Sequence, residues 1–172
     1  MPFDTHSIRK CAYQSPLGAM TLAATDAGLA GAWFDNQRHM PDTRNWPDAP
    51  QDPVLQRATQ QFDEYFAGKR TMFALPLDLR HGTNFQQLVW NALLRIPFGG
   101  NTTYGRLSNS IGKAAAVRAA GSAIGRNPLG IIVPCHRVLG ADGSLTGYAG
   151  GLERKAALLR LEAQSAQHPL PA

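Results

Sequence analysis

The stretch IIVPCHRV, residues 131–138, is the most informative part of this sequence. It completes an apolar run of β-branched and small residues that begins at Pro128, and such a run is expected to be buried. Cys135 ends the run, and His136 and Arg137 follow at once. A buried thiol is usually inert packing, but a neighbouring imidazole and guanidinium can hold the reactive thiolate. The stretch therefore predicts a cysteine nucleophile, with an inert core cysteine as the alternative.

Two further features bear on this thiol. Side chains of adjacent residues usually point apart, so we expect His136 to reach Cys135 through a water rather than directly. A carboxylate behind the histidine would orient it, and Glu162 is the last acidic residue of the chain. Cys11 fits a packing role.

Composition limits the class of protein. The chain has 172 residues and is 44% hydrophobic, enough for one substantial core or two small ones. No stretch approaches the roughly 18 consecutive apolar residues of a membrane span. The start, MPFDTHSIRK, lacks the apolar centre of a signal peptide. We therefore expect a cytoplasmic protein without a membrane partner, in which both cysteines are free thiols.

Charge is distributed unevenly along the chain. Residues 1–79 contain 7 basic and 9 acidic residues, whereas residues 80–172 contain 10 basic and 3 acidic residues. A basic domain beside a near-neutral one is typical of proteins that bind nucleic acid, although the same bias can simply promote solubility.

The first part of the sequence predicts a small α/β domain over residues 1–79. Short β-prone runs and turn residues predict an antiparallel sheet, and residues 36–53 predict a long surface loop. Apolar residues at helical spacing predict a helix over residues 54–66. The expected strands are residues 9–13, 20–24, 28–34 and 72–77, with a turn at residues 15–18.

The second part, residues 80–172, predicts a mainly helical domain. Thr83 and Gln86 have the spacing of a capping box before a helix that ends at Pro97. Two short helices, residues 103–110 and 113–124, flank a glycine turn as in a helix-turn-helix, although most such hairpins are ordinary core. A last helix is expected over residues 152–162, followed by a frayed tail at residues 164–172.

The motif PCHRV stands in a wider pattern, with Arg-Asn-Pro before it at residues 126–128 and Gly-Tyr-Ala-Gly-Gly-Leu after it at residues 147–152. This pattern resembles the O6-alkylguanine-DNA alkyltransferases, also called methylated-DNA–protein-cysteine methyltransferases. The resemblance covers most of the second half, from Phe85 to Glu162, and the first half more loosely, through SPLG at residues 15–18 and the spacing of Phe62, Tyr65, Phe66 and Gly68.

The resemblance implies a fold and an activity. The α/β domain would be ribonuclease-H-like, and the mainly α domain would contain a helix-turn-helix that binds double-stranded DNA with alkylated guanine. The protein would transfer an alkyl group, irreversibly and once per molecule, from O6-alkylguanine and also O4-alkylthymine to Cys135. It would need no cofactor, and it would be monomeric when free and able to cluster on DNA.

The resemblance also implies roles for individual residues. His136 would take the thiol proton through a water, and Glu162 would hold the histidine. Tyr104 would crowd the target phosphate, Arg118 would enter the base stack, and Asn127 would join the second helix to a strand that carries the cysteine. The remaining contacts, with the substrate base, would come from the Val138 carbonyl, the Tyr148 hydroxyl and the Ala149 amide.

Without the resemblance, the same residues have ordinary structural interpretations. Tyr104 and Tyr148 could be half-buried packing aromatics, Arg118 a solvated helix charge and Asn127 a turn former. Three departures from the family pattern stand out: Ala149 where serine is common, Ala163 where glycine is usual, and the extra residue His81. Cys11 and the scattered histidines do not make a four-ligand zinc set, so we expect no metal.

The sequence is also compatible with two other functional classes. A thiol hydrolase would usually activate its cysteine at a helix start with a distant histidine, which disfavours that reading here. A non-enzymatic module would bind lesions and recruit other factors. Such a module would resemble the alkyltransferase-like proteins, which lack the acceptor cysteine. The presence of Cys135 therefore argues against this interpretation.

Overall fold

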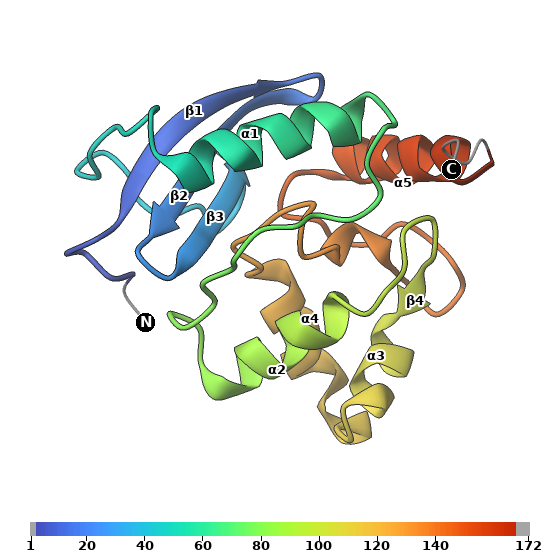
Figure 1. The fold of residues 1–172 in the computed structure, drawn as a ribbon. Coiled ribbons are helices and arrows are strands. Elements are labelled where there is room, and N and C mark those ends of the chain that lie inside the picture. Colours follow the sequence, from blue (N-terminus) through green and yellow to red (C-terminus); the bar gives the residue numbers. More distant parts are fainter. Residues whose placement is uncertain (1–2, 168–172) are drawn as a thin grey trace.

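The N-terminal strands form a three-stranded meander. The computed structural model describes residues 3–167, and in it β1 (Arg9–Ser15), β2 (Gly18–Thr25) and β3 (Gly28–Phe34) pair antiparallel in that order (Figure 1). These three strands and the turn between the first two confirm the prediction. β3 is buried along its whole length, because the main core covers one face of the sheet and a cluster around Trp33 covers the other.

Helix α1 (Pro53–Phe66) packs against all three strands (Figure 1). It starts where predicted because Asp52 caps it, accepting the next two backbone amides at 2.9 and 3.1 Å. Pro53 suits the first helical position, where an amide hydrogen has no partner. The preceding residues form the predicted irregular loop. The predicted apolar face is the buried one and includes Leu55, Ala58, Phe62 and Tyr65.

The segment after α1 differs from the prediction. The strand expected at residues 72–77 is wrong, because only Leu77 makes a bridge, to Leu29 of β3. Pro76 accepts a hydrogen bond from the Leu29 amide at 2.8 Å but has no amide of its own to continue a ladder. Gly28 permits this approach: it has a φ of 146°, and a Cβ there would lie 2.5 Å from the Pro76 carbonyl oxygen.

The C-terminal part is mainly helical, as predicted. Its elements are α2 (Asn84–Leu93), α3 (Tyr104–Ser110), α4 (Val117–Gly125), α5 (Leu152–Gln167), the 3-10 turns η1 (Ala114–Ala116) and η2 (Cys135–Arg137), and the short parallel pair β4 (Thr102–Thr103) and β5 (Val138–Leu139). Thr83 and Gln86 form the predicted capping box of α2. The Trp90 indole of α2 donates to the Ala123 carbonyl of α4 at 2.8 Å, which fixes the second helix of the helix-turn-helix against the core.

Three helix boundaries differ from the sequence prediction. Helix α2 ends at Leu93, earlier than the end predicted at Pro97. The second helix of the motif begins at Val117 rather than at Lys113, because residues 114–116 form the 3-10 turn. The turn before it contains Gly112 with a φ of 71°. Helix α5 continues to Gln167, so the frayed tail predicted at residues 164–172 is wrong for residues 164–167. Residues 168–172 lie outside the described part.

The apolar run before Cys135 is buried, as predicted, but the strand expected there is wrong. After one bridge between Leu129 and Ala32 of β3, the backbone leaves the sheet. Ile131 has a φ of 73°, which is rare for a β-branched residue. Pro134 lacks the amide that a continuing strand would need. The run therefore turns sharply and delivers Cys135 to the start of η2 rather than to the end of a strand.

Both parts of the protein share one hydrophobic core. Its buried residues come from the sheet and α1 and also from α2, α4 and the run before Cys135. In residues 3–167, no helix combines the length and apolar character that crossing a membrane requires.

Candidate active site

Asn127 holds Cys135 in place. The cysteine residue is 8% exposed, and the Asn127 side-chain amide donates to its sulfur at 3.2 Å and to the Val133 carbonyl at 2.7 Å. The Asn127 side-chain oxygen accepts the Leu129 amide at 2.9 Å. Asn127 thereby fixes the sharply turned run at both ends and connects α4 directly to the sulfur.

The surroundings of Cys135 act on its ionisation in opposite directions. Burial raises the pKa of the thiol, because it disfavours the thiolate. The hydrogen bond from Asn127 and the positive charge of Lys155 oppose this rise. The thiol therefore depends on a nearby base to become reactive.

Glu162 of α5 is the centre of a buried hydrogen-bond network. Arg137 donates to both of its oxygens, Nε to Oε2 and Nη2 to Oε1, each at 2.9 Å. The His136 Nε2 lies 2.7 Å from Oε1, and the Tyr65 hydroxyl donates to Oε1 at 2.8 Å. Burial alone would raise the pKa of Glu162, but the hydrogen bonds from His136 and Arg137 hold it at about 2. The carboxylate is therefore ionised at neutral pH.

The ionised carboxylate determines the tautomer of His136. A carboxylate can only accept, so the ring proton lies on Nε2 and the lone pair on Nδ1. Nδ1 is buried and has no hydrogen-bond partner among the described residues. Burial lowers the pKa of His136, and Glu162 opposes this effect. His136 is thus a neutral ring with one nitrogen ready to accept a proton.

A cavity of about 380 Å³ opens beside Cys135. Four predicted site residues line it together: Cys135, Tyr104, Tyr148 and Ala149. The Tyr104 hydroxyl donates to the Thr146 carbonyl at 3.0 Å. Burial raises the pKa of Tyr148 well above its ordinary value, so its hydroxyl stays protonated. The cavity thus presents a nucleophile, two aromatic rings and a hydroxyl donor to a guest molecule.

Basic side chains surround this cavity on the helix-turn-helix side and the loop side. Arg38 and His39 from the N-terminal loop and Arg126 after α4 line it. Arg118 is exposed on α4 and does not line the cavity, but it lies three residues before Gly121, which does. This spacing places both on the same face of the helix. Arg118 therefore lies on the face of α4 that borders the cavity.

Lys155 joins Val138 to the segment that contains Gly147, one of the residues lining the cavity. Val138 pairs with Thr102 in the β4–β5 ladder, and its carbonyl accepts the Lys155 ammonium at 2.6 Å. The same ammonium donates to the carbonyls of Thr146 and Gly147 at 2.9 and 3.2 Å. Val138 is fully buried and is not among the residues that line the cavity, unlike Ala149.

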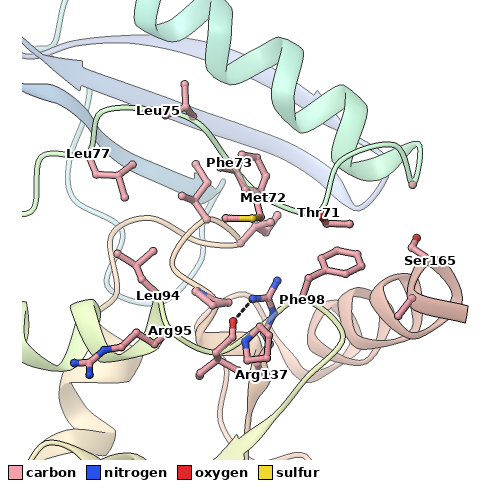
Figure 2. A pocket seen from close by; sticks show the side chains of 17 residues that line it. Thr71, Met72, Phe73, Leu75, Leu77, Leu94, Arg95, Phe98, Arg137 and Ser165 are labelled. Atoms are coloured by element: carbon pink, nitrogen blue, oxygen red, sulfur yellow. Dashed lines mark hydrogen bonds between the residues drawn. The ribbon is translucent and has the colours of Figure 1, made fainter. Parts of the chain in front are cut away.

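A larger cavity of about 760 Å³ lies between residues 71–77 and residues 94–98 (Figure 2). Apolar side chains such as Met72, Phe73 and Leu94 dominate its walls. Arg137 borders it, and the dashed line in Figure 2 marks the hydrogen bond from this side chain to the Ile96 carbonyl, 2.6 Å long. Cys135 is not among the lining residues, so the smaller cavity is the candidate active site.

Comparison with known proteins agrees with this geometry. Residues 84–164 match the family model "6-O-methylguanine DNA methyltransferase, DNA binding domain", and residues 8–79 match "6-O-methylguanine DNA methyltransferase, ribonuclease-like domain". The chain belongs to the 6-O-methylguanine DNA methyltransferase family. The family prediction and the predicted fold class, a ribonuclease-like α/β domain followed by a helical domain, are thereby confirmed.

Named relatives and solved structures support the same family. A methylated-DNA–protein-cysteine methyltransferase of Mycobacterium bovis is 49% identical over 148 residues, 86% of this chain and 88% of the relative. One of Methanosarcina acetivorans is 44% identical over 153 residues, 87% and 95% of the two chains. The O6-methylguanine methyltransferase of Mycobacterium tuberculosis superimposes with a TM-score of 0.84 at 45% identity, covering 96% of both chains. The Mycobacterium tuberculosis OGT in complex with DNA gives 0.82 at 46% identity, covering 92% and 93%.

Two contacts in this methyltransferase site are not predicted from the sequence. In the sequence, Tyr65 is only one of the apolar positions on the predicted helix face. A buried tyrosine hydroxyl needs a hydrogen-bond partner, however, and this need could have indicated the contact. Lys155 is a charged residue in a predicted helix, and nothing local indicates its burial. Within residues 3–167, no group of three or more His, Cys, Asp or Glu side chains could hold a metal ion.

Proposed function

We propose that this methyltransferase repairs DNA by moving an alkyl group, typically methyl, from O6 of guanine to the sulfur of Cys135. One observation carries the proposal: Cys135 faces a cavity, while the neighbouring His136 is neutral, has a free accepting nitrogen and is held by the ionised Glu162. A nucleophile, a base and a group that orients the base are the parts of an activated thiol.

The chemistry follows from these parts. The thiol proton passes through a water to Nδ1 of His136, and Glu162 stabilises the imidazolium. The thiolate attacks the alkyl carbon, so that an S–C bond forms while the C–O6 bond breaks and guanine takes its electron pair. The protonated Tyr148 hydroxyl donates to the purine as charge develops there. A thioether is not hydrolysed under these conditions, so each protein molecule reacts once.

We propose double-stranded DNA that contains alkylated guanine as the partner. A base inside a duplex is out of reach of a protein thiol, so the nucleotide must flip into the cavity at a cost of a few kcal/mol. Arg118, on the face of α4 that borders the cavity, would fill the base stack, and Tyr104 would crowd the target phosphate. The excess of basic over acidic residues after residue 79 favours phosphate contacts.

The finer parts of the proposal concern specificity and organisation. The Val138 carbonyl and the Ala149 amide would recognise base edges. We include O4-alkylthymine as a second substrate, since its alkyl group is also carried by an exocyclic ring oxygen. We place the domain boundary between residues 79 and 80, just after the end of the ribonuclease-like match.

Stoichiometry tests the proposed function. The protein is mixed with an excess of duplex DNA that carries a labelled methyl group at O6 of one guanine, and protein-bound label is followed with time. We expect a plateau at one methyl group per protein molecule. Continued loss of the methyl group from DNA after the plateau, or release of methanol without label on the protein, would indicate a thiol hydrolase instead.

A further inference from the structure

Tyr65 connects the ribonuclease-like domain to the buried network of the active site. It lies on α1, is 1% exposed, and donates its hydroxyl to Oε1 of Glu162 at 2.8 Å across 97 residues of sequence. Its ring packs against Phe66, Phe73 and Phe98, with centroids 5.3 to 6.2 Å apart. These contacts hold the ring, and so the direction of its hydroxyl is fixed.

The Tyr65 hydroxyl shares its acceptor atom with the histidine. Oε1 of Glu162 accepts from His136 Nε2, from Arg137 Nη2 and from Tyr65. Each donor stabilises the carboxylate charge and makes the carboxylate less basic towards the others. Tyr65 therefore bears on the strength of the hydrogen bond that orients His136.

We propose that Tyr65 is a positioning residue for alkyl transfer, which fixes the Glu162 carboxylate and moderates its pull on His136 so that the ring stays neutral and can take the Cys135 proton. The inference rests on the proposed function, since it assigns His136 the role of base. It also gives the N-terminal domain a part in the chemistry, because Cys135, His136 and Glu162 all belong to the C-terminal domain.

The direction of the effect follows from the groups around His136. Arg137 from η2 and Lys155 from α5 act with burial to lower the pKa of His136, whereas Glu162 opposes them. Removing the Tyr65 hydroxyl leaves these groups in place and strengthens the Glu162 effect alone. The pKa of His136 should then rise, so the neutral base is populated only at higher pH.

The other titratable groups of the site act elsewhere in this network. Tyr148 interacts electrostatically with both Cys135 and Glu162, and its own pKa is raised by burial. Neither Tyr148 nor Cys135 forms a hydrogen bond with Glu162 among the contacts of the described residues. The loss of the Tyr65 hydroxyl removes no hydrogen bond of theirs among the described residues, so they do not alter the sign of the effect.

The variant Tyr65→Phe tests the proposal, with Tyr13→Phe as its matched control. Tyr13 is also buried in the N-terminal domain and donates to a carboxylate, Asp63, at 2.7 Å. We expect the acid limb of the pH–rate profile for methyl transfer to move up by about one pH unit in Tyr65→Phe, the scale of a hydrogen bond to a charged group. The profile of Tyr13→Phe should match the wild type. An unshifted profile, or a shift to lower pH, would overturn the proposal.

Two further measurements separate this inference from the proposed function and from a folding defect. The reaction of Cys135 with iodoacetamide, followed by mass spectrometry of its peptide, needs no DNA and should show the same upward shift even if no methyl transfer occurs. If Tyr65→Phe does not fold, 3-fluorotyrosine in place of Tyr65 keeps the hydroxyl as a stronger donor and should move the acid limb to lower pH. No movement with 3-fluorotyrosine would indicate a purely structural role.

Discussion

The two cysteines of this protein are equally buried, each 8% exposed, but they lie in regions of opposite character. Cys11 lies in β1, where burial raises the pKa of its thiol. The carboxylates of Asp52 and Asp48 raise this pKa further, whereas a hydrogen bond with Thr59 lowers it. Burial therefore coincides there with negative charge, which disfavours a thiolate.

Around Cys135 the same burial meets the opposite charge. The Asn127 amide and the Lys155 ammonium favour the thiolate, and the sulfur borders a cavity. The exposed fraction of a cysteine residue thus does not decide whether its thiol reacts. The sign of the nearby charge, a base and access from outside decide it.

The largest expected difference between the two regions concerns the cysteines themselves. Cys135→Ser should abolish alkyl transfer, because only the nucleophile is lost, and should leave DNA binding intact. Cys11→Ser should transfer at close to the wild-type rate. Single-turnover rates and DNA titrations of both variants check this, and transfer by Cys135→Ser would show that another residue accepts the alkyl group.

The next prediction compares the effect on stability of two tyrosine–carboxylate pairs, Tyr65–Glu162 and Tyr13–Asp63. Glu162→Gln should lower the free energy of unfolding by about 3 to 5 kcal/mol, because it leaves the buried Arg137 guanidinium without its partner charge. Asp63→Asn should cost far less, because Asp63 is exposed and only its bond to Tyr13 weakens. Urea unfolding of the two variants measures both values.

The pH dependence of stability gives a second readout of Glu162. Its pKa is held at about 2 in the folded protein, below the ordinary value of 4.5. Its contribution is therefore present above the ordinary value and is lost as the pH falls towards 2. Glu162→Gln should lose part of the acid sensitivity of the wild type, and an unchanged acid unfolding curve would contradict the assigned network.

A smaller effect is expected on the surface beside the cavity. Arg118→Ala should slow repair of duplex DNA by roughly a hundredfold, the scale of unstacking a base, but should hardly affect transfer from free O6-alkylguanine. Arg57, an exposed arginine on α1, offers the control Arg57→Ala, which should change neither rate. Equal losses on both substrates would mean that Arg118 supports the pocket instead.

The smallest effect concerns the protein after reaction. A methyl group on Cys135 enters a packed site, and overpacking commonly costs about 1 to 3 kcal/mol. Because Asn127 links the sulfur to α4, strain should also reach the DNA-binding surface. We expect the methylated protein to melt at a lower temperature and to bind DNA less tightly than the free protein. Matched melts and titrations without any change would show that the site accommodates the group.

The elements that the sequence predicts well are those with local signals. The strands β1 to β3 are bounded by turn residues, and α1 and α2 begin at the caps Asp52 and Thr83. The two incorrect strands, residues 72–77 and the run before Cys135, have strand composition but meet no continuous partner edge. Each contains or adjoins a proline that cannot donate to a ladder, so composition alone does not decide the outcome.

The candidate site shows the same division. Cys135 and His136 are adjacent in sequence, so residue chemistry alone indicates both as candidates. Glu162 is a candidate from residue chemistry as the last acidic residue, whereas Tyr104 and Tyr148 depend on the resemblance to the family, since the distances between them are set by tertiary packing. The Tyr65–Glu162 contact joins two domains across 97 residues, and no local pattern encodes it.

The central claim is that Cys135, and not the equally buried Cys11, receives the alkyl group. The most direct measurement is peptide mapping by mass spectrometry after the wild-type protein has reacted with duplex DNA that contains one O6-methylguanine. The mass of one methyl group should appear on the peptide that contains Cys135, with Cys11 unmodified. A methyl group on Cys11, or repaired DNA beside a protein of unchanged mass, would contradict the account.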